Sequence, residues 1–192
     1  MQWGVLDNNP GREVEKVRLP KRKRYVDDDE FQTVYSLASP TLQVTMDLAV
    51  LTGLRRGDLL SLTRDNLTDE GILITPGKTQ NTSGKTLLIE WSEELRQVID
   101  RAKRLPPEVR QPIIATRRGK AYTGEGFNAN WQRLMKKALE NGLTESFRFH
   151  DLRAKSASDD TADAASERLG HTSKATTDRW YRRKPERVRP LR

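Results

Sequence analysis

Apolar side chains recur along this chain at the spacing of helix faces. The first stripe follows an acidic run at 27–30, whose carboxylates suit a helix N-terminus because they cap free amides and oppose the positive end of the helix dipole. Ser39-Pro40 ends this helix. A second helix, from about 41 to 51, is apolar around most of its circumference, which predicts a central position in the fold. The positions of the first stripe are Phe31, Val34, Tyr35 and Ala38.

The middle of the chain predicts one small sheet between helices. Residues 56–62 favour a short helix. The runs 71–75 (GILIT) and 85–89 (KTLLI) are rich in β-forming residues and flank a polar, turn-forming stretch, which predicts a β-hairpin with a polar tip. A helical stripe at 95–102 follows, and Pro106-Pro107 prevents its continuation.

The second half of the chain predicts further helices and no second sheet. The apolar run 113–115 is too short to assign. The clearest helical stripe ends at Asn141-Gly142, and three more helices are expected near 150–158, 162–169 and 173–183. The fold class is therefore mainly α with a small antiparallel hairpin, without an internal repeat. The apolar positions of the clearest stripe are Phe127, Trp131, Leu134, Met135, Ala138 and Leu139.

The charge balance favours a polyanionic partner. The 192 residues fit one large domain, or one domain with a fragment of another. Lys and Arg outnumber Asp and Glu by 35 to 27, and the net charge is +8. Such a surplus indicates nucleic acid or an acidic membrane surface, with a merely solvated basic surface as the alternative. The basic run 16–25 could likewise be solvated or lie along DNA phosphates.

Composition also narrows the chemistry. The absence of cysteine excludes disulfides, thiolate nucleophiles and cysteine zinc sites. Two histidines without metal-ligand spacing argue against a histidine metal site. No apolar run reaches the roughly 18 residues of a membrane helix, and no signal peptide is visible at the start. We therefore expect a cytoplasmic protein.

Both histidines stand beside residues that suit phosphate chemistry. His150 and Arg153 share one face of a helix in its first turn, where free amides attract anions, and an arginine fork beside an imidazole can clamp a phosphate. An ordinary surface pair is the alternative. His171 lies ten residues before Tyr181, close enough to share a site with it. Tyr181 itself could instead be a packing residue whose hydroxyl reaches water.

Two further cations lie at element boundaries. Arg55 follows the Thr-Gly break after the second helix, and Asp58 could hold it in place; Arg56 is the competing arginine. Lys78 lies on the loop side of the hairpin, from which it could reach bound DNA and protonate a leaving oxygen. An ordinary surface lysine is the alternative reading of Lys78, and Lys85 is its rival.

Taken together, the sequence motifs around these residues resemble those of the tyrosine recombinases, the family of phage integrases and site-specific recombinases. Residues 52–60 (TGLRRGDLL) resemble the family's first-arginine box, and 150–153 (HDLR) resemble its His-x-x-Arg box. Residues 169–181 resemble its terminal segment of histidine and tyrosine. Residues 3–10 (WGVLDNNP) resemble the joint that precedes the catalytic domain. The resemblance covers nearly the whole chain and implies the tyrosine recombinase catalytic-domain fold.

The resemblance implies a covalent reaction on double-stranded DNA. Tyr181 would attack a scissile phosphodiester to give a 3′-phosphotyrosine and a free 5′-hydroxyl, without a metal or a nucleotide cofactor. Arg55 and Arg153 would neutralise the nonbridging oxygens. It further implies a homo-oligomer, a tetramer on DNA, with no membrane and no small-molecule substrate, in a bacterial cytoplasm in association with the nucleoid.

The remaining catalytic roles follow from the same resemblance. His171 would hydrogen-bond the phosphate, His150 would help to accept the phenol proton, and Lys78 would protonate the 5′ oxygen. The resemblance also implies a domain division: 1–25 as a linker from an absent amino-terminal clamp, 26–184 as the catalytic domain, and 185–192 as a basic tail.

Two features depart from the family pattern, and two other functions stay open. The ten-residue interval between His171 and Tyr181 is one longer than the commoner interval and places Trp180 at the usual tyrosine position. Ala154 and Lys155 follow the second box where His-Thr or His-Ser is more usual. A type IB topoisomerase would use the same chemistry, and a non-catalytic DNA-binding module would use only the basic surface.

Overall fold

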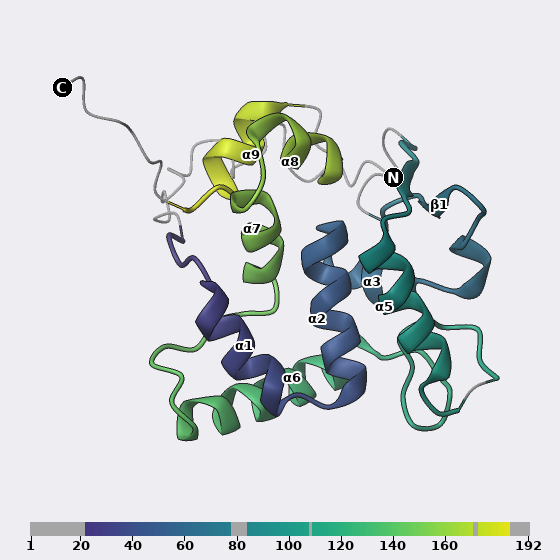
Figure 1. The fold of residues 1–192 in the computed structure, drawn as a ribbon, viewed down its shortest axis with the longest axis horizontal. Coiled ribbons are helices and arrows are strands. Elements are labelled where there is room, and N and C mark those ends of the chain that lie inside the picture. The colour runs from purple at the N-terminus through teal and green to yellow at the C-terminus, as the bar shows by residue number, and fades with distance from the viewer. Residues whose placement is uncertain (1–21, 78–83, 108, 171–172, 185–192) are drawn as a thin grey trace, which may run out of the picture.

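Eight α-helices and one two-stranded sheet make up the part of the chain that the computed structural model describes, residues 22–77, 84–107, 109–170 and 173–184 (Figure 1). This composition confirms the predicted fold class. The helices are α1 (Asp28–Leu37), α2 (Pro40–Thr52), α3 (Arg56–Ser61), α5 (Glu93–Arg104), α6 (Gly124–Glu140), α7 (Asp151–Ser158), α8 (Ala162–Arg168) and α9 (Lys174–Trp180); the strands are β1 (Gly71–Ile74) and β2 (Leu87–Glu90), and a 3-10 turn covers Arg64–Asn66.

The predicted starts of the first two helices are confirmed by their caps. The Asp27 carboxylate accepts the amide of Glu30 at 2.8 Å, and the Glu30 side chain returns to the amide of Asp27, a complete capping box. Ser39-Pro40 does more than end α1. Ser39 caps α2 and Pro40 is its first residue, where a missing amide costs nothing.

Helix α2 lies at the centre of the molecule, as its apolar circumference predicted. It packs against α5 on one side and α7 on the other (Figure 1). Its buried apolar residues join those of α1, α5, α6 and β1 in one core, which includes five of the six residues of the stripe predicted for α6. The sixth, Leu139, is 45% exposed, so the prediction that it lies on the buried face is wrong. Gly53 ends α2 with a φ of 62°, the left-handed conformation that allows the chain to turn sharply at this point. The chain then enters α3 at Arg55.

The sheet is smaller than predicted. Strands β1 and β2 pair antiparallel from Gly71 opposite Glu90 to Ile74 opposite Leu87, so the second strand begins two residues later than expected. A Cβ at Gly71 would lie 2.1 Å from the carbonyl oxygen of Ile89, which excludes any side chain there. The hairpin tip, 78–83, lies outside the described residues. The unassigned run 113–115 forms only an isolated bridge, at Ala115.

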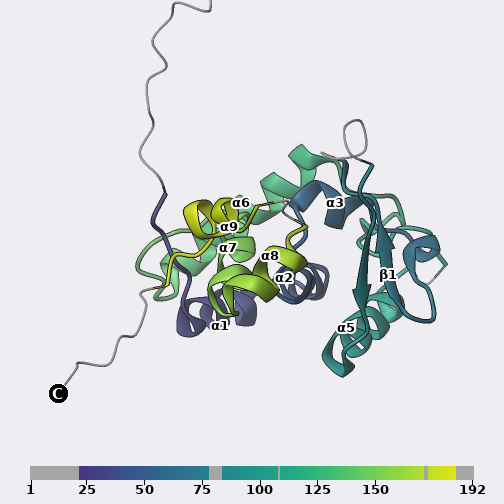
Figure 2. The same cartoon turned by 90° about the horizontal axis from the view of Figure 1, so that it is seen from above.

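The last three helices form a smaller cluster of their own. Ala157, Ala165 and Leu169 are buried together, and Tyr181 packs against them. Helix α9 ends at Trp180, so the prediction of a helix to 183 is wrong. The reason is Ser158: its hydroxyl donates to the Tyr181 carbonyl and accepts from the Arg183 amide, which draws the chain out of the helix. Viewed from above, α3, α6 and α9 lie on one side of the molecule and α1 and α5 on the other (Figure 2).

Candidate active site

Three of the predicted site residues meet where α2, α7 and α9 end or begin. Arg153 lies in the first turn of α7, His150 is the residue that precedes this helix, and Tyr181 is the residue that follows α9. The His150 and Tyr181 rings are 5.8 Å apart, edge to face, and the Arg153 guanidinium lies 5.2 Å from the centre of the Tyr181 ring. The fold therefore brings together residues that are about 30 positions apart in the chain.

Arg153 is buried and held by the backbone of two other elements. One terminal nitrogen donates to the carbonyl of Gly53 at the end of α2, and the other donates to the carbonyl of Leu169 after α8 at 3.0 Å. Only 3% of the residue is exposed. Burial lowers the pKa of Arg153 to about 10, the repulsion from Arg55 adds to this, and Tyr181 opposes it. Arg153 is thus a fixed cation at neutral pH.

His150 remains partly open to solvent beside this cation. Partial desolvation by its surroundings lowers the pKa of His150, and the positive charge of Arg153 lowers it further. The imidazole is therefore neutral at pH 7, and a neutral imidazole can accept a proton.

Arg55 reaches the site from the start of α3. Its guanidinium is 3.8 Å from the Asp58 carboxylate, which confirms the predicted pairing. Asp58 is buried, and its other oxygen accepts the amide of Gly77 at 2.9 Å. This carboxylate therefore fixes the base of the hairpin beside Arg55, a contact that the sequence did not suggest. The competing arginine, Arg56, turns to α6 and donates to Asn128.

Two predicted site residues, Lys78 and His171, lie outside the described residues. The rival lysine, Lys85, is described and exposed. Of the six predicted site residues, the structure brings together Arg55, His150, Arg153 and Tyr181. The roles of Lys78 and His171 remain predictions from the sequence.

A groove of about 990 Å³ opens from Arg55 and His150 along the outer face of α6. Its rim is strongly basic, and Glu145 is the one acidic residue among the described residues that line it. Its floor is made of apolar side chains of α6 and the loop before α7. Such a groove suits a polyanion, because cations on the rim contact phosphates while the apolar floor excludes water. The other cations of the rim are Arg22, Arg56, Lys136 and Arg148; the apolar lining consists of Trp131, Met135, Leu139, Phe147 and Phe149.

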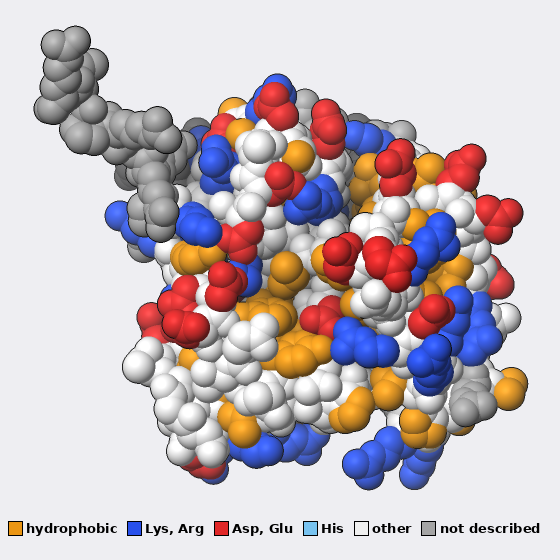
Figure 3. All heavy atoms as spheres, viewed as in Figure 1, with side chains coloured by type: hydrophobic (Ala, Val, Ile, Leu, Met, Phe, Trp, Pro, Cys, Tyr) orange, Lys and Arg blue, Asp and Glu red, His pale blue; other side chains and the backbone are white. Residues whose placement is uncertain are grey.

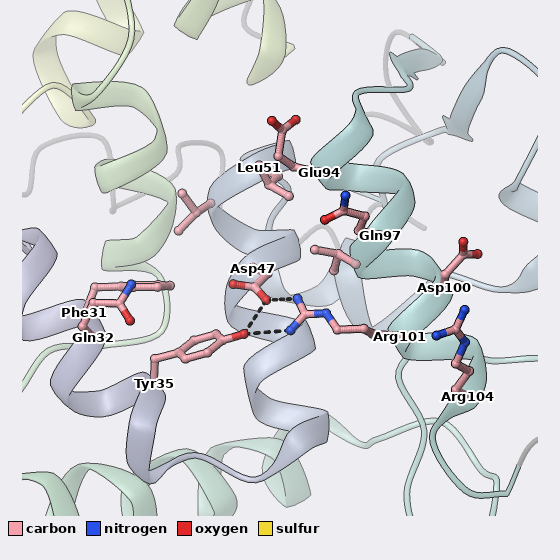
Figure 4. A pocket seen from close by; sticks show the side chains of 12 residues that line it. Phe31, Gln32, Tyr35, Asp47, Leu51, Glu94, Gln97, Asp100, Arg101 and Arg104 are labelled. Carbon is pink, nitrogen blue, oxygen red and sulfur yellow. Dashed lines mark hydrogen bonds and ion pairs between the residues drawn. The ribbon is translucent and has the colours of Figure 1, made fainter.

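A second hollow, of about 660 Å³, lies on the opposite face between α1, α2 and α5 (Figure 4). Within it, Arg101 donates to the Tyr35 hydroxyl at 2.9 Å and pairs with Asp47, to which Tyr35 also donates. The space-filling view of this face shows apolar surface in the hollow with side chains of both charges around it (Figure 3). None of the four predicted site residues that the structure describes lines this hollow, so we do not place the chemistry there.

Four residues that the sequence did not single out hold the Tyr181 segment in place: Asp151, Ser158, Asp159 and Arg183. The hydrogen bonds by which they connect residues 181–184 to residues 151–159 join positions 23 to 32 apart in the chain. A local motif therefore could not have revealed them, although Asp151 stands inside the His-x-x-Arg box.

The described residues contain no group of three or more His, Cys, Asp or Glu side chains arranged to hold a metal ion. Within the same part of the chain, every helix is too short or too polar to cross a membrane.

The comparisons with known proteins point in one direction. The sequence model of the Phage integrase family matches residues 24–187. No curated protein sequence gives a significant match. Among solved structures, a lambda integrase dimer bound to a COC′ core site shares 23% identity at a TM-score of 0.77, over 97% of this chain and 56% of that one.

Two more structures show the same fold. A lambda integrase tetramer bound to a Holliday junction shares 22% identity at a TM-score of 0.75, over 97% of this chain and 56% of that one. XerA recombinase shares 20% identity at a TM-score of 0.70, over 88% of this chain and 63% of that one. The chain therefore spans less than two thirds of the length of these proteins.

Proposed function

Because this chain belongs to the phage integrase family, we propose that it is the catalytic domain of a site-specific DNA recombinase. It would cut and rejoin DNA strands through a covalent 3′-phosphotyrosine. One observation carries the proposal: the Tyr181 ring lies against both His150 and Arg153, beside a basic groove.

The proposed catalytic domain covers residues 26–184. The family match over 24–187 supports these bounds, and so does the continuous core that begins at Val26. The segment 1–25 would act as the linker that enters this domain, and 185–192 as a basic tail.

In the proposed cleavage step, the Tyr181 oxygen attacks the scissile phosphorus as the bond from phosphorus to the 5′ oxygen breaks. The phenol proton passes to neutral His150, whose lowered pKa suits this role. The 5′ oxygen takes a proton from Lys78. Because the phosphotyrosine conserves the bond energy, a second 5′-hydroxyl can reverse the step and exchange strands.

Charge in the transition state would be stabilised by the two arginines. Arg55 is the more accessible and would contact a nonbridging oxygen directly, held by Asp58. Arg153 would supply a buried positive charge that cannot move away as the phosphate binds. His171 would donate a hydrogen bond to the same phosphate.

The proposed partner is double-stranded DNA, bound as a tetramer. The basic groove supports the DNA partner, and the lambda integrase tetramer on a Holliday junction supports the assembly. Binding should be mostly to phosphates and should weaken steeply with salt. A DNA partner would place the protein in the cytoplasm on the nucleoid.

A nicked suicide DNA substrate tests the proposal, because loss of the cleaved end traps the covalent adduct. We expect Tyr181→Phe to abolish the adduct and to leave DNA affinity largely unchanged. Tyr122→Phe is the matched control, since this ring packs against Phe127 away from the groove. An adduct that persists in Tyr181→Phe would move the nucleophile elsewhere.

The same substrate separates the other two functions. A DNA-binding module would form no adduct in any variant. A topoisomerase would form the adduct and would also relax supercoiled DNA as a monomer, whereas a recombinase should need partner subunits to exchange strands.

A further inference from the structure

The carboxylates at the two ends of α7 join the start of the described chain to its end. Asp151 is the first residue of α7, and Asp159 is the residue that caps it. Each binds one side chain from the segment 22–25 and one from the segment 182–184. We call these two segments the amino-terminal strap and the post-tyrosine segment. Figure 2 shows them running along the same edge of the molecule, purple beside yellow.

At the first end, Asp151 binds an arginine from each segment. Arg22 donates to it through Nε at 3.0 Å and Nη2 at 2.8 Å, and Arg183 donates through Nη1 at 2.7 Å. Only 2% of the Asp151 side chain and 9% of the Arg183 side chain are exposed. A buried carboxylate at this depth needs its partners, because an unpaired buried charge costs several kcal/mol.

At the other end of α7, Asp159 also binds one side chain from each segment. The Tyr25 hydroxyl donates to it from the amino-terminal strap, and the Lys184 ammonium lies 3.1 Å away in the post-tyrosine segment. The buried Lys155 ammonium, 2.9 Å away on α7, holds the carboxylate in place. The two segments also touch directly, since Arg183 donates to the carbonyl of Arg24 at 2.8 Å.

Tyr181 depends on these contacts because it lies outside α9. Its carbonyl accepts from Ser158 at 3.1 Å, and two residues later the Arg183 amide donates to the same hydroxyl at 2.8 Å. The Arg183 side chain then reaches Asp151. The backbone from Tyr181 to Arg183 is thus fixed to α7, the helix that directly follows His150 and carries Arg153 in its first turn.

We propose that Asp151 and Asp159 are positioning residues that hold Tyr181 against its partners and tie its position to the amino-terminal strap. The catalytic consequence rests on the proposed function; the mechanical coupling does not. Arg22 makes the coupling responsive to the ligand, because it both pairs with Asp151 and lines the basic groove. A phosphate bound in the groove would compete with Asp151 for Arg22. Because Asp151 also binds Arg183, this competition would change how firmly the segment that follows Tyr181 is held.

The test combines hydrogen exchange with single-turnover cleavage. Arg22→Gln is the main variant, because this side chain is 37% exposed and its loss leaves the core intact; Asp151→Asn removes the shared carboxylate. Arg104→Gln and Asp100→Asn are the matched controls, on the exposed surface of α5 away from both segments. Arg22→Lys should restore most of the wild-type behaviour.

We expect Arg22→Gln to speed amide exchange in residues 178–184, at the opposite end of the chain, by severalfold, and Asp151→Asn by about tenfold or more. Cleavage at saturating DNA should slow by roughly ten- to a hundredfold in Asp151→Asn, since a displacement of about 1 Å can cost this much. DNA affinity should fall only slightly in Asp151→Asn, because every cation of the groove remains, and further in Arg22→Gln, which loses one of these cations.

Each outcome decides between the two proposals. If exchange of 178–184 and the cleavage rate in Arg22→Gln both match Arg104→Gln, the coupling does not exist, although a Tyr181-dependent adduct still supports the proposed function. If the wild type forms no adduct but Arg22→Gln loosens 178–184, the coupling stands and the catalytic proposal fails.

Discussion

Substitution of Arg153 should unfold the protein more easily as well as stop the chemistry, whereas substitution of Arg55 should stop the chemistry alone. Both arginines have the same proposed role at the phosphate. They differ in the other contacts that each side chain makes within the protein. Arg153 donates to the carbonyls of Gly53 and Leu169 from a buried position, while Arg55 is one-quarter exposed and 3.8 Å from Asp58.

The size of the difference follows from these contacts. Hydrogen bonds from a charged group contribute about 1.5–3 kcal/mol each. The glutamine of Arg153→Gln can replace one of the two bonds at most, so a net loss of about 3 kcal/mol is expected. For a domain of this size, that corresponds to a fall in Tm of roughly 6–12 °C. A partly exposed ion pair is worth about 0–1 kcal/mol, and Arg55→Gln also removes a repulsion from Arg153.

Thermal unfolding by calorimetry or circular dichroism measures the first effect, and the suicide substrate measures the second. We expect neither variant to form the adduct at more than about a hundredth of the wild-type rate. Equal Tm values for Arg153→Gln and Arg55→Gln would refute the reasoning, since they would show that the two carbonyl contacts of Arg153 contribute nothing to stability.

Three further predictions concern single residues. Gly53→Ala should lower the free energy of unfolding by about 1–3 kcal/mol in denaturant titrations, because φ is +62° and the new Cβ would lie 2.8 Å from the Leu169 side chain; a neutral result would contradict the packing described. The lowered pKa of His150 predicts a cleavage rate that is flat above pH 6.5 and falls only below it, and His150→Gln should lose this acid limb. Burial raises the pKa of Asp151, but hydrogen bonds from two arginines outweigh it, so the folded-state pKa lies below 3.8. The stability that Asp151 contributes is therefore complete above pH 3.8 and lost as the pH falls below that value; the stability difference from Asp151→Asn should shrink over the same range.

The helices could be predicted because their signals are local. The stripe of α6, the acidic start of α1 and the Ser39-Pro40 boundary all act over a few residues. All are confirmed except the last position of the stripe, Leu139, which is exposed. The ends of elements that depend on distant groups were less predictable. Helix α9 stops at Trp180 because Ser158, 22 positions earlier, binds the backbone that follows.

The candidate site divides in the same way. Motif spacing named Arg55, His150, Arg153 and Tyr181, and the structure brings these four residues together. The motif spacing could not show that both terminal nitrogens of Arg153 donate to backbone carbonyls. Nor could it show that the Asp58 carboxylate accepts a hydrogen bond from the amide of Gly77 at the hairpin.

By itself, then, the amino-acid sequence determined the helical elements, the basic charge and the residues that suit phosphate chemistry, because side-chain type and short-range spacing are enough for these. Only the tertiary structure decided which charges meet. Asp151 binds Arg22 and Arg183, which are 129 and 32 positions away. Ion pairs of this kind depend on the path of the backbone between their partners, and no local pattern carries that information.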